Sequence, residues 1–360
     1  RFSYFCRYGL GAKVLRPAEL DAAEFGTLTH YVMECTLPAY TAEGFANIRR
    51  ERVAADTAAA VAAYVDEYMG GRENKPSRFL HMLARLERTC GSLLWQVVLE
   101  FRQSRFVPVD YELAVGLPPE EGGGAVDPVV LTLPDGARIR VQGKVDRVDA
   151  YRAGEETYIR VVDYKTGARE FRLSDVMAGI NLQMLIYLFA IWQNGAPRYG
   201  TVTPAGVLYL PAKLPVIRVE RGADGERQER ERLRAMRMNG LLLDNPEIVE
   251  AMEADAAGLF IPAKLGTKGF DRSSSIASLE QFGLLRQKIE RLLREMAETL
   301  RSGDIAAVPA TGETVDACAF CDFRAVCGHE QGDAVRFVAK RDAAEVLREL
   351  ETAEADFSEN

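Results

Sequence analysis

The sequence of 360 residues has no apolar run approaching the roughly 20 residues that span a bilayer, so we expect no membrane-crossing segment. It has no G-x-x-x-x-G-K-[ST] phosphate loop, which excludes a P-loop ATPase within these residues. It opens at Arg1 without a methionine or a secretory signal pattern, so we expect a fragment of a longer polypeptide. With 48% hydrophobic and 27% charged residues, the composition is typical of a globular protein of one large or two ordinary domains.

Positive charge is also scarce, because the net charge is −8. Its distribution is uneven: seven acids and two arginines after residue 340 contribute −5, which leaves −3 for residues 1 to 340. Several basic residues flank the acidic centre of the sequence: Lys144, Arg147, Arg169, Arg172 and Arg198. They form either a basic groove for nucleic acid or an ordinary solvated surface, and the sequence leaves both interpretations open.

The six cysteines do not have the spacing of a disulfide framework, which favours a reducing compartment such as the cytoplasm. Cys318, Cys321 and Cys327 follow the pattern C-x2-C-x5-C, which indicates a metal site. Zinc and an iron–sulfur cluster both accept four thiolates, and spacing alone slightly favours zinc. Cys35 and Cys90 fall within helical patterns, and we expect them in the core.

The centre of the sequence, from Gly143 to Lys165, alternates β-branched and polar residues and predicts a hairpin that turns at Ala153 and Gly154. Residues two apart in a strand point to the same face. Asp163 and Lys165 therefore project together, and Asp146 can approach them from the neighbouring strand. Two carboxylates and an ammonium group at one point are typical of a hard-cation site with a catalytic lysine beside it.

Periodicity predicts the remaining elements. Helices are expected at 17–37, 44–69, 77–105, 176–194, 278–302 and 343–355; strands at 106–115 and 206–210; and a hairpin at 131–148 that turns at 134–136. Ser174 or Asp175 is expected to cap the helix at 176, residues 1–10 to pack, and 216–275 remain unassigned. This order predicts an α/β core in which helices pack on a mixed sheet.

Five of these residues and one tetrapeptide occur in a recognisable order: Gly26 and His30 on the first helix, GKVD ending at Asp146, DYKT at 163–166, and Gln183 with Tyr187 as QxxxY. Together they resemble the RecB-like branch of the PD-(D/E)xK nuclease superfamily. With three late cysteines and one early cysteine, the chain further resembles the C-terminal nuclease domains of the AddB family, which belongs to the bacterial AddAB helicase–nucleases. The resemblance implies a restriction-endonuclease-like mixed sheet flanked by helices, an N-terminal helical insertion and a C-terminal iron–sulfur staple.

The resemblance also implies a division of the chain. Residues 1–330 would be the RecB-like nuclease domain, with a helical part at 17–105, the catalytic α/β core at 106–215 and a C-terminal part with the cysteines at 216–330. Residues 331–360 would be an acidic, helical tail.

Roles for individual residues follow from the same resemblance. Mg²⁺ or Mn²⁺ would be held by Asp146, Asp163, His30 and the backbone carbonyl of Tyr164, with Asp146, Asp163 and Lys165 as the catalytic set. Gln183 and Tyr187 would hold a substrate phosphate or brace the lysine, and Glu112 would lie behind the ligands. A [4Fe–4S] cluster would be held by Cys318, Cys321 and Cys327, with the fourth ligand either Cys6 or a residue upstream of Arg1.

The implied activity is a Mg²⁺-dependent deoxyribonuclease, an exonuclease that trims an unwound single strand of DNA during double-strand break repair and recombination. An AddA-like helicase–nuclease subunit would be its partner, in the bacterial cytoplasm. Three alternatives remain open: a free-standing Cas4-like nuclease, a non-catalytic DNA-binding subunit in which the cluster is structural, and an iron–sulfur redox protein. Taken singly, Asp146 could also be a surface residue, Asp163 with Lys165 an exposed ion pair, and His30 a core histidine.

Overall fold

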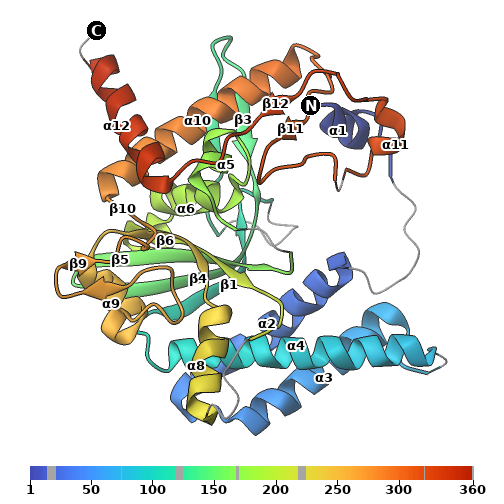
Figure 1. The fold of residues 1–360 in the computed structure, drawn as a ribbon, viewed down its shortest axis with the longest axis vertical. Helices are drawn as coiled ribbons and strands as arrows, with labels where there is room; N and C mark the ends of the chain where they lie inside the picture. The colour runs from blue at the N-terminus through green and yellow to red at the C-terminus, as the bar shows by residue number, and fades with distance from the viewer. Residues whose placement is uncertain are drawn as a thin grey trace.

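The computed structural model describes residues 1–13, 22–73, 75–118, 125–167, 170–217, 224–319 and 321–358. Its centre is a six-stranded mixed sheet with helices on both faces (Figure 1). This is the mixed α/β architecture that the sequence patterns predict, including the helical region at the N-terminal side of the sheet.

The sheet has, in spatial order, β1 (Val107–Val115), β4 (Gly143–Ala153), β5 (Glu156–Lys165), β6 (Thr201–Pro211), β7 (Asn239–Leu243) and β10 (Ile276–Ala277). The pairs β1–β4, β4–β5 and β6–β7 are antiparallel, whereas β5–β6 and β7–β10 are parallel. Central strand β5 is buried along most of its length because helices cover both faces. Its apolar run of Ile159, Val161 and Val162 suits that position.

Three long helices cover one face of the sheet: α2 (Ala22–Glu43), α3 (Arg50–Met69) and α4 (Ser77–Phe101) (Figure 1). The predicted start of the first helix at Pro17 lies outside the described residues. The predicted end at Leu37 is wrong, because α2 continues through Pro38 to Glu43. Tyr40, beyond the proline, is fully buried and its hydroxyl donates to Asp56 at 3.0 Å, so tertiary packing outweighs the helix-breaking tendency of proline.

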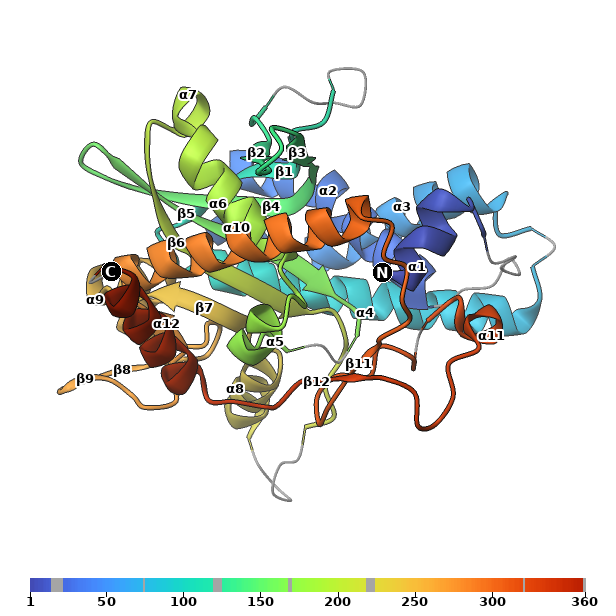
Figure 2. The same cartoon turned by 90° about the horizontal axis from the view of Figure 1, so that it is seen from above.

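The opposite face carries α5 (Leu173–Met177), α6 (Gln183–Asn194), α7 (Ala196–Tyr199) and α10 (Leu279–Arg301) (Figures 1 and 2). The single helix predicted at 176–194 is wrong: Gly179 and Asn181 have φ of +75° and +58°, which separates α5 from α6. Ser174 and Asp175 are not caps, because both lie inside α5, whose N-cap is Arg172. The crossover through these helices brings β6 parallel to β5.

The hairpin predicted at 131–148 turns where expected but ends sooner. β2 (Val129–Thr132) and β3 (Arg138–Val141) form a separate two-stranded sheet, and Gly136 in the turn has φ of +83°. After Gln142 the chain begins β4, which pairs with β1 and β5 instead. A single strand from Arg138 to Tyr151 was therefore the wrong expectation, because the two halves have different partners.

The region that the sequence left unassigned holds α8 (Gly225–Ala235), α9 (Pro246–Met252) and the small hairpin β8 (Leu265–Gly266) and β9 (Gly269–Phe270), besides β7. α10 begins at Ser278 with a capping box to Gln281, close to the predicted start. Its buried side contains Phe282, Leu285 and Ile289. The final helix, α12 (Ala343–Ser358), packs on α10 through Val346, Leu347 and Leu350.

The first residues lie against the cysteine segment. α1 (Phe2–Tyr4) and a π-helical turn at Phe5–Gly9 stand beside α11 (Arg324–Cys327) in both views (Figures 1 and 2). Arg7 donates to Asp322 at 3.2 Å and its guanidinium lies 5.9 Å from the ring centroid of Phe323. Two regions more than 300 residues apart in sequence are thus joined, close to β11 (Ala310–Thr311) and β12 (Arg336–Phe337).

The other cysteines differ from each other. Cys90 is fully buried, as expected, but Cys35 is exposed on α2, so its predicted core position is wrong. None of the helices among the described residues is both long enough and apolar enough to cross a membrane.

Candidate active site

The predicted site residues come from four elements that meet where β4 and β5 part. They are His30 on α2, Glu112 on β1, Asp146 on β4, Asp163, Tyr164 and Lys165 at the end of β5, and Gln183 and Tyr187 on α6. Pairing between β4 and β5 ends at Arg147 and Val162, so Asp146 is the first residue beyond the ladder. The two strands diverge there and leave room for side chains between them.

Asp146 is fixed by the backbone of the neighbouring strand. The Tyr164 N–H donates to Asp146 Oδ2 at 2.9 Å, across the gap left by the end of the ladder. The Tyr164 ring meets His30 edge-on, with ring centroids 5.6 Å apart at 89°. One β5 residue therefore orients two of the predicted metal ligands.

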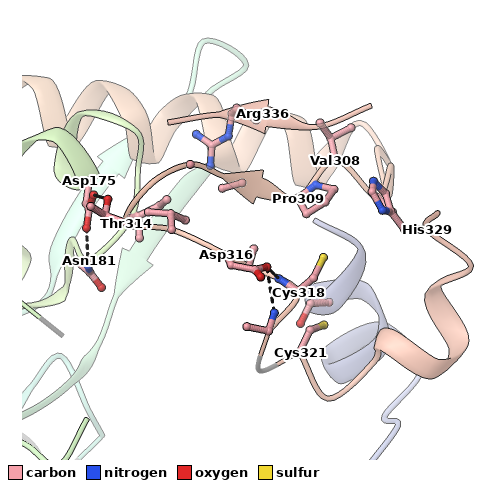
Figure 3. Close-up of a pocket in the computed structure, with 18 of the residues that line it drawn as sticks. Asp175, Asn181, Val308, Pro309, Thr314, Asp316, Cys318, Cys321, His329 and Arg336 are labelled. Carbon is pink, nitrogen blue, oxygen red and sulfur yellow. Dashed lines mark hydrogen bonds between the residues drawn. The ribbon is translucent and has the colours of Figure 1, made fainter. Parts of the chain in front are cut away.

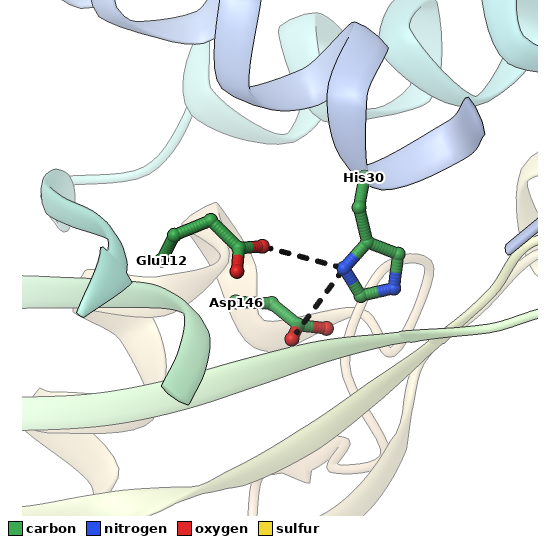
Figure 4. Close-up of side chains that lie close together, drawn as sticks. All are labelled: His30, Glu112 and Asp146. Atoms are coloured by element: carbon green, nitrogen blue, oxygen red, sulfur yellow. Dashed lines mark hydrogen bonds and ion pairs between the residues drawn. The ribbon is translucent and has the colours of Figure 1, made fainter. Parts of the chain in front are cut away.

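His30, Glu112 and Asp146 converge on one point (Figure 4). His30 Nδ1 lies 3.4 Å from Glu112 Oε1 and 3.5 Å from Asp146 Oδ1. One ligand atom from each of the three lies within 4.8 Å of the others, the only such group of three or more metal-ligating residues among the described residues. The sequence placed Glu112 behind the ligands, whereas the structure places it beside them.

Glu112 reaches this point through an unusual backbone conformation. Its φ is +46°, in the left-handed region that side chains other than glycine rarely adopt. It faces Asp146 across the β1–β4 ladder, between the pairs Tyr111–Arg147 and Leu113–Val145. No sequence pattern signals such a conformation in a strand.

Asp163 and Lys165 project together, as their spacing predicts. Lys165 Nζ donates to Asp163 Oδ1 at 2.8 Å. It also lies 2.8 Å from Asp163 Oδ2, but that buried oxygen accepts no hydrogen bond from the described residues. The Asp163 side chain is 7% exposed and that of Lys165 is 27% exposed, so the carboxylate is enclosed while the ammonium group reaches solvent.

Burial and crowded negative charge shift the titration of this group. Burial raises the pKa of Asp146 to about 7, and the Asp163 carboxylate acts in the same direction. For His30, burial lowers the pKa, but the hydrogen bond to Glu112 and the charge of Asp146 outweigh it, so the pKa is raised. Negative charge is thus held in a poorly hydrated place, where binding of a divalent cation would relieve the repulsion.

Gln183 and Tyr187 have separate positions. Tyr187 is buried, and a Cβ added to Gly143 would lie 2.1 Å from its hydroxyl oxygen, so only glycine fits where β4 begins. Gln183 is exposed, and its side-chain amide donates to the Tyr187 hydroxyl at 3.2 Å. Tyr187 therefore supports the start of the strand that carries Asp146.

Gly26 stands one turn before His30 on α2 and faces the loop after Lys165. A Cβ there would meet the Thr166 side chain at 3.8 Å, which is ordinary contact. The first and third sequence motifs therefore touch in space.

A buried charge network behind the site was missed by sequence reasoning. Arg147 and Arg160 are both fully buried and share Asp149, with Nε distances of 2.8 and 2.9 Å to its two oxygens. Arg160 also donates to Glu100 of α4 at 2.5 Å. Charges two residues apart within apolar strands were the available signal, because such residues share a face and require partners there.

This network changes the interpretation of the basic residues. Arg147 is buried and Arg198 is paired with Asp110, so neither lines an open groove. Arg172 pairs with Glu170 at 2.6 Å, Lys144 is exposed, and Arg169 lies outside the described residues.

The three late cysteines line one cavity of about 920 Å³ between the N-terminal segment, the loop after β5 and the 306–319 segment. Figure 3 shows Cys318 and Cys321 beside the N-terminal helical segment. Cys6 is buried within that segment, next to Arg7, which contacts the cysteine loop. The two chain ends therefore meet as the predicted staple requires, and the ligand roles of the thiols remain a prediction.

Residues 1–328 match the family model described as the PD-(D/E)XK nuclease superfamily. The chain therefore belongs to this superfamily, whose fold and motif order agree with the site described above. Within it, the chain is homologous to the C-terminal part of AddB proteins, the second of the two subunits of ATP-dependent helicase/deoxyribonucleases.

Three such relatives illustrate the similarity. The protein of Acetivibrio thermocellus is 32% identical over 91% of this chain, that of Ruminiclostridium cellulolyticum 32% over 92%, and that of a Thermoanaerobacter species 29% over 97%. The aligned parts are 28%, 29% and 31% of the respective relatives. The chain thus spans less than a third of the length of the curated relatives it matches.

Proposed function

We propose that this chain is a metal-dependent DNA nuclease domain that hydrolyses phosphodiester bonds with Asp146, Asp163 and Lys165. The observation that supports it most is the meeting of the His30–Asp146 pair with the Asp163–Lys165 pair where β4 and β5 part. The names of the relatives support DNA as the substrate and a helicase–nuclease of the AddAB type as the assembly, with an AddA-like protein as partner. Double-strand break repair and recombination are the proposed setting, and an unwound single strand is the proposed substrate.

The donor set fits a hard divalent cation, Mg²⁺ or Mn²⁺. Carboxylates, a backbone carbonyl and one imidazole suit these ions, and the unpartnered Asp163 Oδ2 is a buried acceptor that a cation would satisfy. Asp146, Asp163, His30 and the Tyr164 carbonyl would hold the ion. When bound, it would supply a water of lowered pKa and neutralise charge on the phosphate.

Lys165 would orient the attacking water and stabilise the charge that develops on the scissile phosphate. The water oxygen bonds to phosphorus, the bond from phosphorus to the leaving sugar oxygen breaks, and that oxygen takes up a proton from solvent. Asp163 holds the ammonium group at 2.8 Å, so its position is set before substrate arrives.

Gln183 and Tyr187 would serve this site in different ways. The exposed Gln183 amide is free to meet a substrate phosphate on its solvent side, while the buried Tyr187 supports β4 at Gly143. Bracing of Lys165 by Tyr187, the other expected role, receives no contact among the described residues.

We further propose that Cys318, Cys321 and Cys327 hold a [4Fe–4S] cluster, with Cys6 or a residue upstream of Arg1 as the fourth ligand. No three cysteine sulfurs in the described part of the chain lie within 4.8 Å of one another, whereas one zinc ion draws its sulfurs to about 3.8 Å. The wider spacing supports a larger cluster. Such a cluster would close the nuclease domain of residues 1–330, and residues 331–360 would be the acidic helical tail.

The test is cleavage of labelled single-stranded DNA with Mg²⁺ or with EDTA. We expect cleavage only with Mg²⁺, and a loss of about 100-fold or more for Asp163→Ala and Lys165→Ala. Lys268→Ala, which removes an exposed lysine in the turn between β8 and β9, is the matched control and should cleave at the wild-type rate. Equal rates for all four proteins, or full activity in EDTA, would contradict the proposal.

A further inference from the structure

The two carboxylate oxygens of Asp146 face two different groups. Oδ1 lies 3.5 Å from His30 Nδ1, on the side of α2 and β1. Oδ2 accepts the N–H of Tyr164 at 2.9 Å, on the side of β5. A single carboxylate placed in this way can bridge two neighbouring cations, about 3.5–4 Å apart in two-metal sites.

The α2 side holds a complete set of three donors. His30 Nδ1, Glu112 Oε1 and Asp146 Oδ1 are separated by 3.4 Å and 3.5 Å along the two measured edges, and all three lie within 4.8 Å of each other. Adjacent ligands of an octahedral ion at about 2.1 Å are about 3.0 Å apart, so contraction by a few tenths of an ångström would close the three around one ion. Glu112 extends to this point from a left-handed backbone conformation, opposite Asp146.

The β5 side has its own indication of a cation. Asp163 Oδ2 belongs to a side chain that is 7% exposed, and it accepts no hydrogen bond from the described residues. The Asp163 carboxylate acts electrostatically on both Asp146 and His30, so it faces the same space as they do. Lys165 alone leaves this oxygen without a hydrogen bond.

The charges agree with more than one cation. Glu112, Asp146 and Asp163 carry three negative charges against the single positive charge of Lys165, while His30 is neutral whenever it binds a metal. One divalent ion neutralises this group. The charge of a second is matched by the phosphodiester and by the hydroxide that attacks it, so two ions suit the site with substrate present.

We propose that Glu112 is a direct ligand and that His30, Glu112 and Asp146 Oδ1 form a second divalent-cation position, bridged by Asp146 to the one at Asp163 and the Tyr164 carbonyl. This rests on the proposed function for the Asp163 position. In the rival arrangement, Glu112 accepts a hydrogen bond from the imidazole and only orients His30. The two differ in the number of ions bound.

The experiment counts Mn²⁺ ions bound to the whole chain, by calorimetry and by electron paramagnetic resonance, without DNA and with an uncleavable single-stranded phosphorothioate. We expect two ions in the wild type with the oligonucleotide, showing the spin coupling of a bridged pair. Glu112→Gln should bind one ion, or the second at least tenfold more weakly, with no coupling. Asp163→Asn should also bind one ion, held by Glu112.

Glu155→Gln, in the exposed turn of the β4–β5 hairpin, is the matched control and should bind two. Thermal melting in EDTA identifies any variant that fails to fold, in which case Glu112→Asp, which shortens the side chain and keeps its charge, replaces it. One ion in the wild type, or two coupled ions in Glu112→Gln, would overturn the proposal. Two ions without DNA cleavage would leave it standing and count against the proposed function instead.

Discussion

At Gly143 the space for a side chain is taken by the Tyr187 hydroxyl, 2.1 Å from where a Cβ would stand. We expect Gly143→Ala to destabilise the fold by about 1–3 kcal/mol, because β4 and α6 must separate to admit a methyl group. Urea unfolding measures this change. Tyr187→Phe in the same chain should recover only part of the loss, because the ring carbon Cζ is also within 2.8 Å.

Gly283→Ala provides the control for this substitution. It lies inside α10 with nothing within 4 Å of the added Cβ, and should be neutral or stabilise by up to about 1 kcal/mol. If Gly143→Ala were as stable as Gly283→Ala, the close fit of Tyr187 on β4 would be wrong.

Residue positions were predictable where a short repeat fixes them. The contact between Asp163 and Lys165 follows from strand alternation, and that of Asp146 with β5 from the hairpin. The place of Glu112 was not predictable, because it depends on a φ of +46° that no residue type in FVPVDYELAV encodes. The exposure of Cys35 was missed because a helical pattern does not say which face a neighbouring helix covers.

Between elements, the buried network of Arg147, Asp149, Arg160 and Glu100 joins α4 to β4 and β5. Asp149→Ala should cost about 3–5 kcal/mol of unfolding free energy, because two buried guanidinium groups would keep only Glu100 as a counter-charge. Urea unfolding is again the measurement. Arg301→Ala, which breaks the exposed pair with Asp135 at 2.6 Å, is the control and should match the wild type.

A loss below about 1 kcal/mol for Asp149→Ala would mean that the network does not hold α4 to the sheet. Elements with strong periodicity, such as α3, α4 and α10, were predicted close to their true bounds. The failures have physical causes: packing carries α2 through Pro38, and two left-handed residues divide the expected helix at 176–194. A pattern of apolar residues reports neither of these.

On the scale of the whole molecule, the proposed cluster would close a loop of more than 300 residues between Cys6 and Cys318. Cys321→Ala should therefore lower the melting temperature by at least about 5 °C in anaerobically purified protein, because loss of the cluster releases that loop. Cys35→Ala, which removes an exposed cysteine on α2, is the control and should melt with the wild type.

Iron and sulfide analysis of the same samples distinguishes the metals. We expect iron and acid-labile sulfide in the wild type and much less of both in Cys321→Ala. Zinc without iron, or identical melting of the two variants, would contradict the proposed cluster. The meeting of the chain ends could be anticipated only from the family resemblance, because the local pattern of neither end indicates the other.

The most direct test of the central claim is the single-turnover rate at which Lys165→Ala cleaves a short single-stranded DNA in saturating Mg²⁺, compared with the wild type. Lys165 reaches solvent and pairs only with Asp163 among the described ion pairs, so its loss should leave melting and DNA affinity unchanged. A rate about 100-fold lower at equal DNA affinity is the predicted result. A rate equal to that of the wild type would show that the lysine beside the paired carboxylates does no chemistry, and would contradict the assignment of this site.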